Sequence, residues 1–143
     1  ITNECDFTGY EISTDAFKIC SEKSIDNVKF VFDNAVNSSN KKHDVALVID
    51  VIEHVENYLK FLRDIKDSNL YTKYIFHVPL DISVLSVVRI GGIMNARRDS
   101  GHIHYFTKDI ALEALKECGF KTIQWNYTYS SIEIKYDTLS SKL

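Results

Sequence analysis

The sequence is poor in the features that mark membrane proteins and nucleic-acid-binding proteins. Its 143 residues include one proline, five glycines and three cysteines, and no apolar run approaches the length of a membrane-spanning helix. The formal net charge of −3 shows no excess of the basic residues that bind phosphate backbones. We therefore expect a cytoplasmic globular domain, with neither a membrane nor a nucleic acid as partner.

The three cysteines, Cys5, Cys20 and Cys118, are far apart in the sequence and odd in number. This spacing fits neither a disulfide framework nor a zinc-binding pair. We interpret all three as reduced thiols that are buried in the folded protein.

Short apolar, β-rich runs alternate with helical patterns along the chain. Such alternation predicts a doubly wound α/β domain with a mostly parallel sheet and, at its C-terminal end, an antiparallel strand pair. Residues 44–50 are apolar on both faces, which predicts a strand that helices cover from both sides. The expected strands are 7–12, 28–33, 44–50, 73–78, 121–129 and 132–137, and the expected helices are 13–23, 55–65 and 108–118.

The segment from Leu80 to Gly101 has no clear strand or helix pattern. It contains paired glycines and three arginines, among them Arg97 and Arg98. Connections of this length without regular structure are often lids over a binding site. We therefore expect an irregular segment that helps to select the substrate.

Acidic residues stand at the ends of the predicted strands. Glu11, Asp33 and Asp50 each come at or just after an apolar run, and further polar residues follow Val78. Ligands of open α/β sheets bind at the carboxyl ends of the strands. Each acid could instead cap the next helix. Together the four positions favour a binding site.

Several segments occur in a familiar order, namely "GYEIS", "FVFDNA", "DVALVIDVIEHVEN", "YIFHVPLD" and "GHIHYFT". This series resembles the class I S-adenosylmethionine-dependent methyltransferases, in particular the group with a "DVLEHV"-like segment. The resemblance begins near Phe7 and implies a Rossmann-like fold. It also implies S-adenosyl-L-methionine as cofactor and methyl transfer to a small-molecule acceptor.

The resemblance implies a role for each strand-end acid. Glu11 would accept hydrogen bonds from the ribose hydroxyls, although it could instead cap the following helix. Asp33 would accept a hydrogen bond from the adenine amino group. A turn formed by Asp33 and Asn34 is an equally good interpretation. Asp50 would lie near the positive sulfonium. The residues that we expect to bind the cofactor are Glu11, Ile12, Asp33, Asn34, Asp50 and Val51.

Histidines supply the candidate catalytic groups. A histidine can remove the proton of an oxygen acceptor near neutral pH. We expect His104 or His54 to act as base, and His102 and Arg97 to contact the substrate. Alternatively, His104 anchors the next helix, His54 bonds within the fold and Arg97 is part of a solvated charged face.

A divalent metal is a further alternative. Asp50, Glu53 and His54 have i, i+3, i+4 spacing, which shares one face if a helix has already begun there. Some methyltransferases of small-RNA ends and of ubiquinone synthesis bind a metal through such a segment, completed by a later histidine such as His102 or His104. Because the same string is common in relatives without a metal, we expect none.

The family's first motif, a strand followed by a glycine-rich turn, is not found here. The glycines lie at 9, 91, 92, 101 and 119, and none forms a close-spaced nucleotide loop or "GxGxxG". Without that strand, the strands at 7–12 and 44–50 would face a gap. We therefore expect residues 1–143 to form a single methyltransferase-like domain that lacks its first strand and is an N-terminally truncated fragment.

Two alternatives stay open. The first is a naturally rearranged relative that fills the gap from a partner chain. The second, of a different functional class, is a non-catalytic methyltransferase-like module for binding or assembly. Cofactor binding by the intact protein would separate the module from an enzyme.

Overall fold

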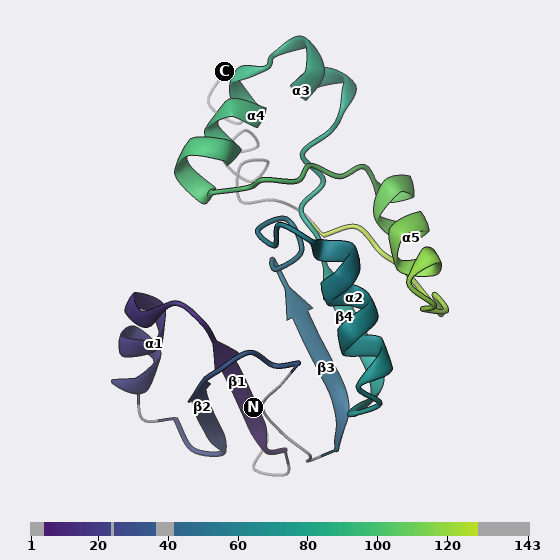
Figure 1. Cartoon of the computed structure of the whole chain (residues 1–143). Coiled ribbons are helices and arrows are strands. Elements are labelled where there is room, and N and C mark those ends of the chain that lie inside the picture. The colour runs from purple at the N-terminus through teal and green to yellow at the C-terminus, as the bar shows by residue number, and fades with distance from the viewer. Residues whose placement is uncertain (1–4, 24, 37–41, 129–143) are drawn as a thin grey trace, which may run out of the picture.

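The computed structural model describes residues 5–23, 25–36 and 42–128. Its four strands lie where the sequence predicts them and form two small parallel sheets rather than one (Figure 1). β1 (Phe7–Glu11) pairs with β2 (Val28–Phe32), and β3 (His43–Ile49) pairs with β4 (Tyr71–His77). The predicted mixed α/β class with parallel strands is confirmed, whereas a single sheet is not formed by the described residues.

One edge of β1 and one edge of β3 have no strand partner among the described residues. β1 is bonded only to β2, and β3 only to β4. An unpaired strand edge exposes backbone N–H and C=O groups that can form hydrogen bonds with a further strand.

The first helix, α1 (Thr14–Ser21), lies within the predicted helix 13–23. Ser13 accepts a hydrogen bond from the amide of Ala16, which satisfies one of the free donors of the first turn. The helix packs on the β1–β2 pair through Phe17, whose ring lies 5.2 Å from that of Phe32 between centroids.

The hydrophobic core lies between the β3–β4 pair and two helices, α2 (Tyr58–Asp67) and α5 (Lys108–Glu117). Asn57 and Thr107 cap these helices by accepting hydrogen bonds from amides in their first turns. Gly119, at φ 84°, ends α5 in the left-handed conformation that glycine tolerates. The buried residues of the core are Val48, Ile52, Leu62, Ile65, Phe106, Ala111, Leu115 and Cys118.

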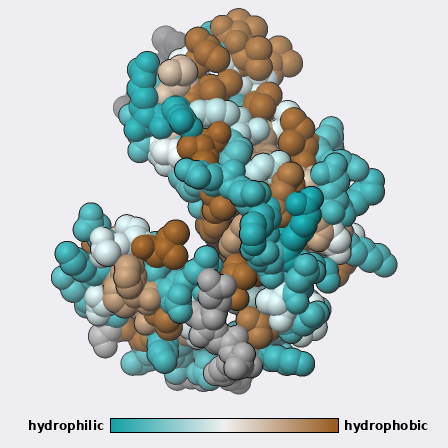
Figure 2. All heavy atoms as spheres, viewed as in Figure 1, coloured by the Kyte–Doolittle hydropathy of each residue, from teal (hydrophilic) through white to brown (hydrophobic). Residues whose placement is uncertain are grey.

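The opposite face of the β3–β4 pair is exposed, so the prediction of a sheet covered on both sides is wrong for the described residues. Val45, Leu47, Ile49 and Ile75 all have large exposed fractions, for example 54% for Leu47. Figure 2 shows apolar side chains at the surface along β3. An apolar run therefore predicted the strand correctly but did not predict what covers it.

The segment from Leu80 to Gly101 is mostly helical, which corrects the prediction of an irregular lid. It forms α3 (Val84–Val88), α4 (Gly91–Asn95) and a π-helical turn, η1 (Ala96–Ser100). Gly101 ends the series at φ 74°. These helices are short and largely exposed, so packing does little to hold them.

The predicted antiparallel C-terminal strand pair is not confirmed. Residues 121–128 follow α5 without forming a strand, and residues 132–137 lie outside the described residues. Both strand pairs that the structure describes are parallel.

The three cysteines are free thiols, as predicted, but they are not all buried. Cys118 lies in the core, Cys20 is half-buried and Cys5 is exposed. Among the described residues, no helix has the length and apolar character that crossing a membrane requires.

Candidate functional site

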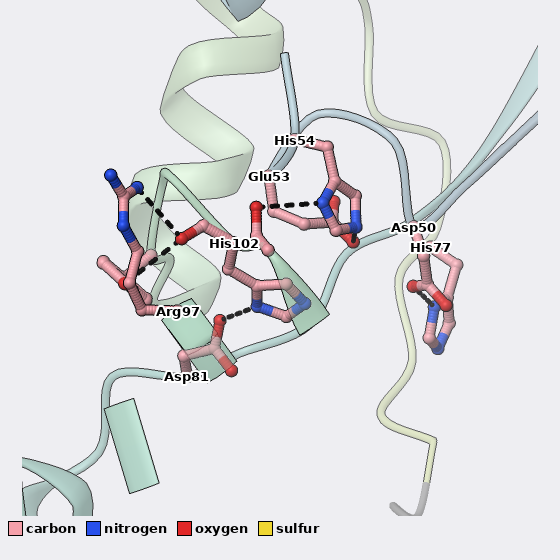
Figure 3. Close-up of polar contacts among 9 residues, drawn as sticks. Asp50, Glu53, His54, His77, Asp81, Arg97 and His102 are labelled. Atoms are coloured by element: carbon pink, nitrogen blue, oxygen red, sulfur yellow. Dashed lines mark hydrogen bonds and ion pairs between the residues drawn. The ribbon is translucent and has the colours of Figure 1, made fainter. Parts of the chain in front are cut away.

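Polar side chains from three segments meet beyond the carboxyl ends of β3 and β4 (Figure 3). At the end of β3, Asp50 adopts φ 50°, a left-handed conformation that is uncommon outside glycine. It turns the chain so that Nδ1 of His77, the last residue of β4, donates a 2.6 Å hydrogen bond to Oδ1 of Asp50. Such backbone conformations are concentrated at functional sites.

Glu53 lies in the turns between Asp50 and α2. The next helix, α2, begins only at Tyr58. Asp50, Glu53 and His54 therefore do not share one face of a helix, which the i, i+3, i+4 spacing of a metal-binding segment would require. The turns instead bury Glu53 completely, with 0% of its surface exposed. Its backbone carbonyl accepts hydrogen bonds from the amides of Ile103 and His104 at 2.8 and 3.1 Å. Segment 101–104 is thereby fixed beside it.

His54 and His102 both lie close to the Glu53 side chain and to each other. Nε2 of His54 lies 3.7 Å from Oε1 of Glu53, and the two imidazole rings are 5.1 Å apart between centroids. Together, one ligand atom from each of the three side chains falls within 4.8 Å of the others. Nδ1 of His102 donates a 2.8 Å hydrogen bond to Oδ2 of Asp81.

The environment of Glu53 opposes its ionisation. Burial raises the pKa of its carboxyl above the usual value, and the nearby Asp50 raises it further. Its own backbone amide, His54 and His102 act in the opposite direction, and burial dominates. A perturbed carboxyl beside two histidines is typical of a functional site.

His104, a predicted catalytic base, is held by backbone carbonyls. Its Nε2 lies 3.0 Å from the carbonyl of Val55 and 3.1 Å from that of Glu56, so this nitrogen must be the donor. Its ring packs edge-on against Tyr58 at 4.8 Å between centroids. This geometry favours the anchoring role for His104.

The two predicted substrate residues lie next to each other. The exposed Arg97, in η1, donates a hydrogen bond of 3.3 Å from Nη1 to the backbone carbonyl of His102. Its positive charge therefore lies at the rim of the histidine cluster (Figure 3). An anionic group of a substrate could bind there.

The residues that we predicted to bind the ribose and the adenine lie together at the carboxyl end of the β1–β2 pair. Glu11 is in register with Phe32, so Asp33 follows directly beside it. Oε1 of Glu11 accepts hydrogen bonds of 2.8 Å from the amides of Ile12 and Ser13. Asp33 accepts from the amide of Asn34, whose own side chain accepts from Val36. The turn weighed as an alternative for Asp33 and Asn34 is therefore present, whereas Ser13, and not Glu11, caps α1.

Two hollows lie near β2. One, of about 350 Å³, joins the end of β2 to the start of α2, and the other, of about 400 Å³, lies at the opposite end of β2, away from the strand-end acids. The first is the better match to the adenine prediction because it contains Asn34. Its lining residues are Asn34, Val36, Val55, Asn57, Lys60, Phe61 and Asp64.

Three residues of the site were not among the predicted site residues. His77 and Asp81 each bond a predicted site residue, and Glu53 lies at the centre of the cluster. His77 and Asp81 occur in the quoted string "YIFHVPLD", where a histidine and an acid flank the end of a strand. Their position at the end of a predicted strand was the feature of the sequence from which both site residues could have been predicted.

Comparison with known proteins gives the family. Residues 2–124 match the family model described as a methyltransferase domain, a span that includes every described strand and helix. The chain therefore belongs to this methyltransferase-domain family, in agreement with the resemblance in its motifs. No curated protein matches the chain.

Proposed function

We propose that this domain binds S-adenosylmethionine at the carboxyl ends of its parallel strands and transfers the methyl group to a small-molecule acceptor. The observation that carries the proposal is the family match over residues 2–124 together with acids at the ends of β1, β2 and β3. Ligands of open α/β sheets bind at the carboxyl ends of the strands.

Glu11 would hold the ribose. The hydrogen bonds from Ile12 and Ser13 both go to Oε1, which fixes the carboxylate and leaves Oε2 for a ribose hydroxyl. Hydrogen bonds to a carboxylate are shorter and stronger than those between neutral groups. These local hydrogen bonds are compatible with the ribose role, because Oε1 orders the turn before α1 while Oε2 would bind the hydroxyl.

Asp33 and Asn34 would bind the adenine. Asp33 follows β2 next to Glu11, and Asn34 borders the hollow of about 350 Å³. A carboxylate or amide oxygen there would accept a hydrogen bond from the adenine amino group.

Asp50 and Val51 would lie near the methionine part of the cofactor. The carboxylate of Asp50, oriented by His77, is about half exposed and can approach the positive sulfonium. Asp50, at φ 50°, turns the chain directly after the end of β3.

Methyl transfer moves the methyl group from the sulfonium to a nucleophile of the acceptor, while the sulfur keeps the electron pair of the broken bond. Alignment of the two reactants can supply roughly 7–11 kcal/mol. The acceptor's proton passes to a base, and His54 is better placed than His104 because its Nε2 bonds no carbonyl. Arg97 and His102 would contact the acceptor.

Calorimetric titration of S-adenosylmethionine tests the proposal. The full-length protein should bind one equivalent, and Glu11→Gln should weaken binding by at least about tenfold, because a charge-assisted hydrogen bond contributes about 1.5–3 kcal/mol. Asp15→Asn, at an acid in the first turn of α1, is the matched control and should bind normally. Absence of binding by the folded full-length protein would overturn the proposal and favour the non-catalytic module.

A further inference from the structure

His77 is hydrogen-bonded at both ring nitrogens, and its partners come from two other parts of the chain. Nδ1 lies 2.6 Å from Oδ1 of Asp50, which directly follows β3 (Figure 3), and Nε2 lies 3.1 Å from Oγ1 of Thr128. The carboxylate can only accept, so Nδ1 carries the proton. In the neutral ring the lone pair is therefore on Nε2, and the hydroxyl of Thr128 donates to it.

This arrangement is the one that a general base needs. A carboxylate that accepts from Nδ1 fixes the tautomer of the ring and stabilises the imidazolium that forms when Nε2 takes up a proton. A hydroxyl within hydrogen-bond distance of Nε2 can give its proton to that nitrogen. Asp50, His77 and Thr128 thus place an orienting acid, a base and a hydroxyl in one series of hydrogen bonds.

The three side chains are open to solvent, as the site of a base for an external acceptor must be. The side chains of His77 and Asp50 are 44% and 53% exposed, and Thr128 is exposed as well. Because Thr128 is exposed, an acceptor hydroxyl that arrives from solvent can take the place of its Oγ1 beside Nε2.

The other histidines of the site lack this combination. Nε2 of His104 bonds backbone carbonyls, and Nε2 of His54 lies 3.7 Å from an oxygen of the buried Glu53. His102 has a carboxylate partner, but its side chain is only 12% exposed. His77 therefore offers the better placed lone pair, because its Nε2 faces an exposed hydroxyl.

We propose that His77 is the general base of methyl transfer and that the acceptor is a hydroxyl compound, whose oxygen takes the position of Oγ1 of Thr128. This inference rests on the proposed function and assigns the acceptor's proton to His77 rather than to His54. Asp50 is the positioning residue of His77, and in the proposed cofactor site it lies near the sulfonium. The hydrogen bond between Asp50 and His77 therefore places the base next to the methyl donor.

Protons and electrons balance in this step. The proton of the acceptor's O–H group passes to Nε2 of His77, while a lone pair of the same oxygen forms the new bond to the methyl carbon. The carbon–sulfur bond breaks, and its electron pair stays on the sulfur, which becomes neutral. The positive charge thus moves from the sulfonium to the imidazolium, which Asp50 stabilises until water removes the proton.

A thiol placed beside Nε2 reports whether His77 acts as a base at this position. Thr128→Cys replaces the hydroxyl by a more acidic group, and a histidine that accepts its proton increases the fraction of thiolate. In the full-length protein at about pH 6, the new thiol should react with iodoacetamide at least about tenfold faster than the same thiol in a variant that also carries His77→Gln. Adding Asp50→Asn instead of His77→Gln should remove much of the difference. Mass spectrometry measures each rate, with the exposed Cys5 as the reference thiol.

His43→Gln is the matched control, because His43 is the first residue of β3 and lies at the opposite end of the β3–β4 pair. Added to Thr128→Cys, it should leave the alkylation rate unchanged. Because His77 and Thr128 are exposed, their variants should fold as the unaltered protein does. The proposal is overturned if His77→Gln changes the rate no more than His43→Gln does.

Methyl transfer gives a second readout, with catechol as the probe hydroxyl and aniline as the probe amine. His77→Gln should lower kcat for catechol at least about 100-fold and leave the affinity for S-adenosylmethionine unchanged. Thr128→Val should keep kcat, because the acceptor hydroxyl replaces that of Thr128. Unchanged kcat in His77→Gln, or transfer to aniline alone, would overturn the proposal. If neither probe is methylated, the thiol measurement decides the question.

The inference and the proposed function can fail separately. The thiol measurement contains neither cofactor nor acceptor, so it also separates the effect of Asp50 on His77 from the proposed effect of Asp50 on the sulfonium. Absence of S-adenosylmethionine binding would overturn the proposed function. Normal cofactor binding together with an ordinary thiol in Thr128→Cys would overturn only the assignment of His77.

Discussion

Nδ1 of His77 donates a 2.6 Å hydrogen bond to Oδ1 of Asp50, and this bond joins the ends of two neighbouring parallel strands. The pair fixes the Asp50 carboxylate at the edge where the sulfonium is proposed to lie. An acid oriented in this way can distinguish a charged cofactor from its neutral product.

Asp50→Asn should weaken binding of S-adenosylmethionine more than binding of S-adenosylhomocysteine, which has no charge on sulfur. Because Asp50 is half exposed, we expect a loss of about 1 kcal/mol, or roughly fivefold, for the charged ligand only. Competition binding measures both affinities. His77→Ala, which keeps the carboxylate, should preserve their ratio, and an equal loss for both ligands in Asp50→Asn would contradict the electrostatic role.

His104→Ala should destabilise the protein by about 0.5–1.5 kcal/mol, because the carbonyls of Val55 and Glu56 would lose their partly buried donor. Chemical unfolding measures the change in the free energy of unfolding. His104→Gln retains an N–H donor and should lose less. Unchanged stability in both variants, combined with loss of methyl transfer, would instead support His104 as the catalytic base.

Leu62→Ala should lower the free energy of unfolding by about 2–5 kcal/mol, because Leu62 is fully buried in the core beneath β3. Leu85→Ala is a suitable control, since Leu85 lies exposed on α3. A small effect at Leu62 would show that α2 does not pack on the sheet as described.

The cysteines should differ in reactivity toward an alkylating reagent. Burial raises the pKa of the Cys118 thiol, and only the thiolate reacts. Because this pKa is higher in the folded state, the thiol contributes stability below its unfolded pKa and loses that contribution as pH rises through the folded value. Mass spectrometry should find Cys5 modified first and Cys118 modified only in denaturant. Rapid modification of folded Cys118 would contradict its place in the core.

Local patterns predicted the strands and the long helices well. Apolar runs locate β1 to β4, and the predicted helices 13–23, 55–65 and 108–118 correspond to α1, α2 and α5. These signals depend on neighbouring residues in sequence and therefore survive without knowledge of the tertiary structure. The short helices between Leu80 and Gly101 have too few turns to show a clear periodicity.

Features that depend on distant contacts could not be predicted in the same way. The exposure of Leu47 depends on what packs against the sheet, and residues 121–128 need a partner before they can form a strand. The cluster of Glu53 and His102 exists because backbone hydrogen bonds join residues far apart in sequence. The motifs identified the correct region, and only the structure showed which side chains meet.

Photolabelling tests the cofactor proposal most directly. The full-length protein would be irradiated with methyl-labelled S-adenosylmethionine and digested, and the labelled peptides would be sequenced. We predict label on peptides that contain Glu11, Asp33 or Asp50, and its loss when S-adenosylhomocysteine is present in excess. Label confined to other peptides, or label that S-adenosylhomocysteine does not displace, would contradict a cofactor site at the carboxyl ends of these strands.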